Sequence, residues 1–200
     1  MPERVFKSPF YEELSSVITD LGGLYNAHLH LDRAGTSELR YMEGAFKDSG
    51  YQSYLSLAKK HDLISVIHNS SAYKPKNLSE RINYYLDIML SVGTSNASTF
   101  VDVACDRVGL SALEVMLEIK RLRNNDINLA VGAYSPLGFN DSEPQEWDLL
   151  VKGAELADFI GSLPERDDKR YYPTHIGFHE HCRRMLVLGH RLKKPVHIQV

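Results

Sequence analysis

The feature that most constrains the fold is a regular alternation of short apolar segments with amphipathic segments. Five segments have the length and composition of strands, at 24–31, 98–104, 127–134, 158–163 and 195–200. The last four are each preceded by a segment typical of a helix, at 78–92, 111–123, 142–154 and 174–193. Such alternation predicts parallel strand–helix–strand units with right-handed crossovers.

The helical segments are predicted from their spacing and end signals. Apolar residues recur at i, i+3, i+4, i+7 and i+8, namely Ile82, Tyr85, Leu86, Met89 and Leu90. Ser79 is expected to cap this helix and Gly93 to end it. Ser111 and Glu114 have the spacing of a capping box for the next helix.

Two α/β architectures fit this pattern, an open doubly wound sheet and a (β/α)₈ barrel. No Gly-rich phosphate loop follows any of the strand-like segments, which argues against a nucleotide-binding sheet. In both architectures the chemistry lies at the carboxyl ends of the strands. Those ends are therefore where candidate functional residues are expected.

Composition narrows the function classes. The formal net charge of −3 removes the electrostatic case for non-specific binding to nucleic acid or to an acidic membrane surface. The 43% hydrophobic content is typical of a folded globular chain, and there is no run of about 18 apolar residues and no signal peptide. Two cysteines, Cys105 and Cys182, do not make a disulfide framework, which favours a reducing, cytoplasmic setting.

The connection between the first strand and its helix, residues 33–77, is unusually long. Ordinary connections of this kind have about 2–6 residues, and longer ones are usually functional. The segment contains several aromatic residues and a helical pattern over 51–61. We expect a lid over the site, and the alternative is a packing insertion that does not contact substrate.

Two histidines close the first strand-like segment, in the sequence NAHLHLD. His28 and His30 are two residues apart, so on a strand they point to the same face and can converge on one metal ion. Asp32 continues that face and could contact a metal-bound water or a ligating histidine. The alternative is a pair of structural histidines beside a loop.

His197 strengthens the metal interpretation. It lies in an apolar strand-like segment, where a buried imidazole needs a partner. In a barrel, inward-pointing residues of the first and fifth strands meet in one interior. His28, His30 and His197 then form the three-ligand pattern of a catalytic metal site, although His197 could instead be a core histidine bonded to backbone.

The other histidines carry weaker signals. His175 and His179 are four residues apart on the predicted helix 174–193, a spacing that can bind metal, but packing or a tertiary hydrogen bond is the favoured role. His181 and His190 are expected to be surface or partly buried, and nothing singles out the two histidines of the long connection, His61 and His68.

Polar residues at the ends of other strands are weak candidates. Asp102 follows the second strand as a candidate for substrate binding, or for anchoring a loop or a neighbouring arginine. Tyr134 begins a loop that could form a pocket wall. Glu165 is a candidate proton shuttle if it turns inward, and a solvated loop residue otherwise.

Four segments resemble the amidohydrolase superfamily, whose members are metal-dependent hydrolases on a (β/α)₈ barrel, and within it cytosine deaminase and related deaminases. They are NAHLHLD at 26–32 with Glu43-Gly44 beyond it, FVDV at 100–103 with the helix 112–123, the run from 154 to Leu163-Pro164, and Lys194-Pro195-Val196-His197. The resemblance covers residues from about 20 to 200 in order.

The resemblance implies a barrel of which this chain holds the first five strands. It implies His28, His30 and His197 as ligands of one divalent metal, Zn²⁺ or Fe²⁺, that makes a hydroxide for attack on a C–N bond. The family also uses a histidine of a sixth strand and an aspartate of an eighth. Because a barrel takes about 250 residues, we expect 1–200 to be the N-terminal part of a longer protein.

The chain departs from the deaminase pattern at three places. The proton-shuttle glutamate three residues after the fifth-strand histidine is replaced by Val200. The loop 134–139 has no pyrimidine-binding glutamine, and Pro164 is followed by Glu165 rather than by histidine. The resemblance therefore does not extend to cytosine as the substrate.

We accordingly expect a metal-dependent hydrolase acting on a C–N bond of a small molecule, with no nucleic-acid or membrane partner. Association of the chain with copies of itself is compatible with the sequence. One alternative is an inactive barrel that only binds, favoured by the loss of the shuttle at Val200. Another is a TatD-type nuclease, which also begins with His-x-His-x-Asp, although the near-neutral charge and the long connection argue against it.

Overall fold

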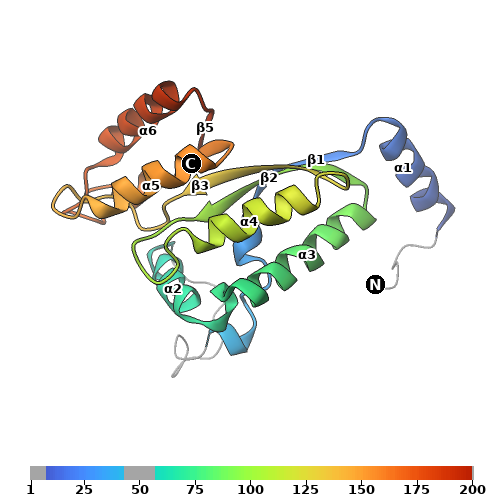
Figure 1. Ribbon diagram of the computed structural model, residues 1–200, viewed down its shortest axis with the longest axis horizontal. Coiled ribbons are helices and arrows are strands. Elements are labelled where there is room, and N and C mark those ends of the chain that lie inside the picture. Colours follow the sequence, from blue (N-terminus) through green and yellow to red (C-terminus); the bar gives the residue numbers. More distant parts are fainter. Residues whose placement is uncertain (1–7, 43–56, 200) are drawn as a thin grey trace.

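The computed structural model describes residues 8–42 and 57–199, and its strands form one parallel sheet (Figure 1). The strands are β1 (Leu24–Leu29), β2 (Thr94–Asp102), β3 (Asn128–Tyr134), β4 (Phe159–Ser162) and β5 (Val196–Ile198). They are hydrogen-bonded in the order β1-β2-β3-β4-β5, and every neighbouring pair is parallel. The predicted α/β fold with five parallel strands is confirmed, and the full eight-stranded barrel stays a prediction.

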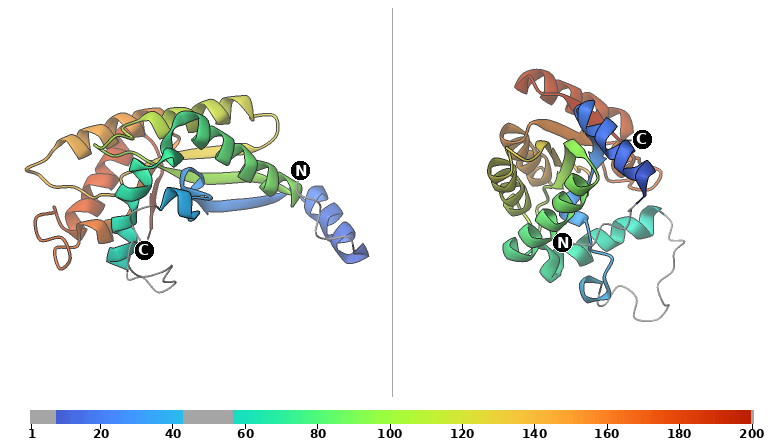
Figure 2. Two further views of the ribbon diagram at one scale, coloured as in Figure 1. Left: turned by 90° about the horizontal axis from the view of Figure 1, so that it is seen from below. Right: turned by 90° about the vertical axis from the view of Figure 1, so that its right-hand side faces the viewer.

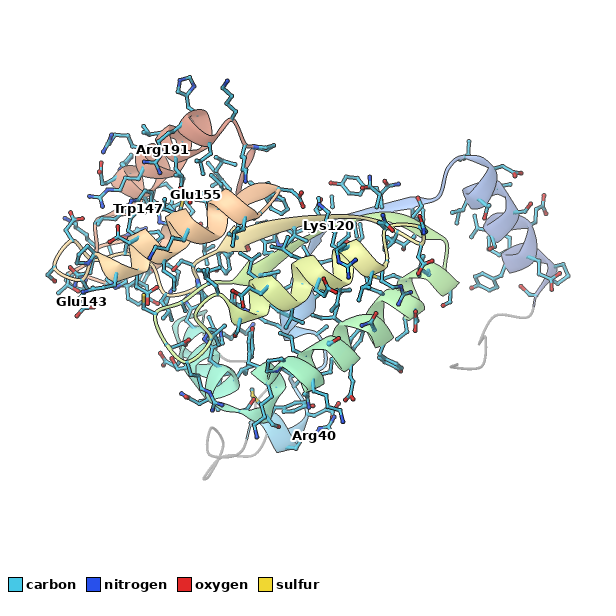
Figure 3. The ribbon with its side chains drawn as sticks, in the orientation of Figure 1. Arg40, Lys120, Glu143, Trp147, Glu155 and Arg191 are labelled. Atoms are coloured by element: carbon cyan, nitrogen blue, oxygen red, sulfur yellow. The ribbon has the colours of Figure 1, made fainter. Side chains whose placement is uncertain are left out.

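The helices that connect the strands cover one face of this sheet, as the two views of Figure 2 show. They are α3 (Pro75–Ser91), α4 (Ser111–Leu122), α5 (Gln145–Leu156) and α6 (Phe178–Leu192). The main core lies between them and the sheet, with Leu78, Ile82, Leu113, Met116 and Leu150 fully buried. Their outer surface is polar, and Figure 3 shows Lys120, Glu155 and Arg191 on α4, α5 and α6.

A further helix, α1 (Pro9–Asp20), precedes β1 and projects from the amino-terminal end of the sheet (Figure 1). None of its residues is buried, and the sequence analysis did not predict it. Among the described residues, no helix combines the length and the hydropathy that crossing a membrane requires.

The sheet is rolled into a half-barrel. In a flat sheet, strands four places apart would be separated by about 19 Å, because neighbouring strands lie about 4.8 Å apart. The ring centroids of His28 on β1 and His197 on β5 are only 5.2 Å apart. The sequential strand order and this curvature agree with a barrel and exclude the doubly wound sheet.

Phe100 of β2 fills the concave face of the rolled sheet. Its ring is fully buried and packs against Tyr134 of β3 and Phe159 of β4, with centroid distances of 6.0 and 5.3 Å. A Cβ atom built on Gly161 of β4 would lie closer than 3.0 Å to two atoms of the Phe100 ring. Gly161 therefore provides the space in which this ring lies.

Several element boundaries differ from the sequence predictions. The helix predicted over 78–92 begins at Pro75, because proline suits the first turn of a helix, and Ser79 does not cap it. The capping box of Ser111 and Glu114 is wrong, because the cap position is Leu110 and the Ser111 hydroxyl donates to the Val108 carbonyl.

The helix predicted over 174–193 begins only at Phe178, so His175 and His179 do not share a helix face. His175 lies in the preceding loop, and its Nδ1 is 2.8 Å from Asp167. The expectation for His181 is also wrong. It is 1% exposed and lies between Asp167 and Ser162, at 2.6 and 2.9 Å.

The long connection after β1 contains η1 (Leu31–Arg33), η2 (Leu39–Tyr41), α2 (Leu57–Asn69) and η3 (Ser71–Tyr73). Figure 2 shows α2 at the carboxyl end of the sheet. The helix predicted over 51–61 falls partly outside the described residues, as do Glu43-Gly44, and in the described part helix continues to Asn69. The lid stays a prediction.

Arg81 of α3 fixes the backbone of this connection. Its guanidinium donates hydrogen bonds to the main-chain carbonyls of Ala34, Asp32 and Ala72, the last two at 3.1 and 2.8 Å. One side chain of an outer helix thus holds two distant parts of the connection together.

A buried cluster of charges joins the same connection to the end of β2. Asp102 is fully buried, and its carboxylate accepts from Arg33 at 2.8 and 2.5 Å, from His68 of α2 at 3.0 Å and from the Tyr73 hydroxyl at 2.8 Å. Asp32 accepts from the Asp102 amide and from the Tyr73 hydroxyl, at 2.9 and 3.0 Å.

The cluster changes the acidity of its members. Although burial favours neutral forms, the Arg33 charge and the His68 hydrogen bond hold the pKa of Asp102 well below its usual range. Burial and the neighbouring Asp102 charge raise the pKa of Asp32 to about 6. Burial opposes the charge on His68, but its bonds to Asp102 and Asp106 prevail and raise its pKa to about 9.

We expect Gly161→Ala to lower the free energy of unfolding by about 1–3 kcal/mol, because overpacking displaces buried side chains. Gly153→Ala is the matched control, since a Cβ there would meet its nearest neighbour at 3.1 Å. Urea unfolding of the purified protein measures both. Equal losses in the two variants would contradict the tight fit of Phe100 against Gly161.

We expect the stabilisation by His68 to depend on pH. Its pKa rises from 6.5 to about 9 on folding, so the contribution is complete below pH 6.5 and is lost as the pH rises to 9. The unfolding free-energy difference between wild type and His68→Gln should therefore shrink over that range, by on the order of 3 kcal/mol. His190→Gln, at an exposed site, is the control. A difference that is constant with pH would show that His68 is not charged in the folded protein.

Candidate active site at the carboxyl ends of the strands

The three histidines predicted as metal ligands meet on one aromatic surface. His28 and His30 lie at and just beyond the end of β1, and His197 lies on β5. The His28 ring is 5.5 Å from that of His30 and 5.2 Å from that of His197. The Phe100 ring lies 4.8, 5.2 and 4.8 Å from the three imidazoles, so it forms the floor beneath them.

Two of these imidazoles are held in the neutral form. Burial, followed by the nearby Arg33 charge, lowers the pKa of His30 to about 4. Burial and then the neighbouring His28 lower the pKa of His197. Neutral imidazoles have a free lone pair, which is the form that binds metal ions.

One ring nitrogen is left without a partner. The Nδ1 atom of His30 is buried and makes no hydrogen bond within the described residues. A buried polar atom without a partner is costly in a folded protein. In the described ranges, 8–42 and 57–199, no three His, Cys, Asp or Glu side chains are already placed to share one ion.

Tyr134 lies between the histidines and an arginine. Its ring is 5.5 Å from that of His30, and the Arg33 guanidinium lies 5.6 Å from the Tyr134 ring centroid. Burial raises the pKa of Tyr134 to about 12, so its hydroxyl stays protonated at neutral pH. The structure thus places this residue, expected to line a pocket, directly beside the imidazoles.

The carboxylates predicted near the site have partners other than the three imidazoles, and Asp102 anchors a neighbouring arginine, one of the roles expected for it. Asp32 and Asp102 are both fully buried within the charged cluster, where Asp102 orients Arg33. Glu165 lies in η4 (Pro164–Asp167), which packs against α6, and its buried Oε2 makes no hydrogen bond within the described residues. Burial, and then this carboxylate, raise the pKa of the Cys182 thiol on α6. Within the described part of the chain, the three acidic candidates thus serve as anchors or lie towards α6. Val200 falls outside it.

Sequence reasoning missed four residues of this region. Phe100 could have been found, because it alternates with Asp102 on β2 and so shares its face. Arg33 directly follows Asp32, but nothing in its spacing indicated that it would pair with Asp102. His68 carries no local signal, since its bond to Asp102 joins residues 34 positions apart, and the contact of Arg166 with Tyr172 follows no helix or strand period.

The chain is similar to known proteins over part of their length. No family model matches the chain. An uncharacterised protein from Haemophilus influenzae is 29% identical over 170 residues, which is 84% of this chain and 55% of that protein. The chain therefore spans little more than half the length of that curated relative.

Two solved structures share the fold. One is 5-methylcytosine deaminase from Klebsiella pneumoniae liganded with 5-fluorocytosine, with a TM-score of 0.68, 20% identity, and coverage of 88% of this chain and 38% of that one. The other is N-isopropylammelide isopropylaminohydrolase from Burkholderia multivorans, with a TM-score of 0.62, 19% identity, and coverage of 88% and 40%.

At 19–20% identity these two likenesses show the fold, and at that level the resemblance inferred from the sequence is confirmed. The chain has the fold of a partial barrel of these deaminase and aminohydrolase structures.

Proposed function

We propose that this chain carries part of the active site of a metal-dependent hydrolase of the amidohydrolase type. The reaction is attack on a C–N bond of a small molecule, in an amide, a cyclic amide or an amino group. The observation that carries the proposal is the meeting of His28, His30 and His197 on the Phe100 ring, across a sheet rolled to bring its first and fifth strands together. The fold shared with two C–N hydrolases supports the same reaction class.

The residues present fit one divalent metal ion, zinc or iron. Three imidazole nitrogens suit these borderline metals, and the orphaned Nδ1 of His30 is a donor that no protein group uses within the described residues. When bound, such a metal lowers the pKa of a water and polarises the bond under attack. His28, His30 and His197 would hold it.

The surrounding residues have separate roles in this proposal. Phe100 prevents water from reaching the imidazoles from below, because its ring is fully buried against all three. Tyr134 offers a protonated hydroxyl to the substrate. Arg33 is held towards Tyr134 by its two bonds to Asp102. Asp102 is thus a positioning residue.

An inactive barrel that only binds a small molecule is the second candidate. It is favoured by Val200, which stands where the resemblance implies a proton-shuttle glutamate, and by Asp32 and Asp102, which are both hydrogen-bonded within the buried cluster. Both the enzyme and the binding protein use the three histidines, but only the enzyme turns over a substrate.

The protein should bind about one zinc ion per chain, measured by elemental analysis and calorimetric titration. Substitution of His28, His30 or His197 by Ala should weaken zinc binding by about 100-fold or more, since removing even an outer-shell partner costs about 10–100-fold. His190→Ala, on the exposed surface of α6, is the matched control and should bind like wild type.

Unchanged zinc affinity in all three variants would overturn the assignment of the ligands. Zinc binding without turnover of any amide, cyclic amide or amino substrate by the intact protein would instead support the binding protein. Hydrolysis that is lost with chelator and in His197→Ala would establish the enzyme.

A further inference from the structure

Arg166 is a buried arginine without an acidic partner. It lies in η4, directly after β4, and is only 8% exposed. Its Nη1 donates to the hydroxyl of Tyr172, and its guanidinium lies 4.5 Å from the centroid of that ring. Its Nε is buried and makes no hydrogen bond, and no carboxylate among the described residues forms an ion pair with it. A buried cation of this kind is costly unless an anion compensates it.

The segment that carries Arg166 is held firmly. The neighbouring Asp167 is fully buried and accepts from the Phe139 amide at 2.7 Å, and it also contacts His175 and His181 at 2.8 and 2.6 Å. His181 in turn contacts Ser162 at the end of β4. The position of the arginine is therefore set in advance, which reduces the entropy that a bound group would cost.

Arg33 and Arg166 act on the same two side chains. Burial, then Arg166, then Arg33 lower the pKa of His61 on α2 to about 4. Both arginines also oppose the burial that raises the pKa of Tyr134. Arg33 follows β1 and lies beside Tyr134, whereas Arg166 follows β4 and lies beside Tyr172, which also contacts His61. Both arginines therefore stand at the carboxyl ends of the strands.

The Arg33 and Tyr134 side of this region borders the proposed metal site. The Tyr134 ring is 5.5 Å from the His30 ring, and the His61 Nδ1 is 3.2 Å from the Tyr172 hydroxyl that Arg166 also contacts. Arg33 uses its Nε and one terminal nitrogen on Asp102, and its side chain remains 24% exposed. Each arginine therefore keeps donors that no described residue uses.

We propose that Arg33 and Arg166 together bind a carboxylate of the substrate, beside the C–N bond that is cleaved. The planar fork of a guanidinium matches the two oxygens of a carboxylate, and a low-dielectric site strengthens the pair. The substrate class is then a small acidic amide, cyclic amide or amine. The location of the cleaved bond rests on the proposed function, whereas the carboxylate site does not.

The test compares two ring amides that differ by one carboxylate, L-pyroglutamate and 2-pyrrolidinone. Binding to the intact protein is measured by calorimetry in the presence of chelator, so that no metal contributes. We expect L-pyroglutamate to bind at least about tenfold more tightly, as charge-assisted hydrogen bonds imply. Equal affinities, or no binding of L-pyroglutamate at its highest soluble concentration, would overturn the proposal.

Variants locate the binding. Arg166→Gln should remove the preference for the acidic ring, and Arg166→Lys should keep only part of it, because an ammonium lacks the planar fork. Arg170→Gln is the matched control, since Arg170 is an exposed arginine paired with Asp168. Thermal unfolding checks that each variant is folded. If Arg166→Gln does not fold, the comparison with wild type is made with Arg166→Lys. A full preference in Arg166→Gln would show that Arg166 only joins η4 to Tyr172.

The two proposals fail separately. A protein that prefers L-pyroglutamate in chelator but binds no zinc would retain the carboxylate site and lose the metal-dependent reaction. A protein that binds zinc through its three histidines but shows no preference between the rings would retain the metal site and lose the carboxylate site.

Discussion

The curvature of the sheet is the constraint on which the site depends. Side chains of β1 and β5 come within 5.2 Å only because five strands roll around the ring of Phe100. That ring touches aromatic or imidazole groups of β1, β3, β4 and β5, and the absence of a side chain at Gly161 leaves it room. The packing of one apolar residue thus decides whether three histidines are neighbours.

Polar side chains at the carboxyl ends divide into two groups. Asp102 accepts hydrogen bonds from His68, Tyr73 and Arg33 within one cluster, in which Arg33 uses only its Nε and one terminal nitrogen. In contrast, His30 and Arg166 each bury a nitrogen that finds no partner in the described chain. Native proteins pair nearly all buried polar atoms. We therefore interpret the hydrogen-bonded cluster around Asp102 as structural, and the region of His30 and Arg166 as the part that contacts a ligand.

Much of the fold could be predicted from the sequence because it depends on local pattern. Strand–helix alternation and the spacing of Ile82, Leu86 and Met89 needed no knowledge of distant contacts, and the His-x-His spacing placed two imidazoles on one face. Helix starts were less predictable, since Pro75 outweighed Ser79 as a start signal.

The rest of the site could not be read in this way. The pairing of Asp102 with Arg33 and with His68 joins residues 69 and 34 positions apart, and no periodicity encodes such contacts. His181 was expected at the surface or partly buried. Its burial could not be predicted, because it depends on the position of η4, where Asp167 contacts the His181 ring.

The hydrogen bonds of the loop after β1 have a consequence for folding. Arg81 reaches back 47 and 49 positions to the carbonyls of Ala34 and Asp32, and Asp102 reaches back 69 positions to Arg33. The local hydrogen bonds of the loop close only single turns, such as that from the Ala34 amide to the Leu31 carbonyl. Its path is therefore fixed only after α3 and β2 have docked and the cost of closing long segments has been met. The first loop of the site therefore becomes structured after α3 and β2, although it precedes both of them in the chain.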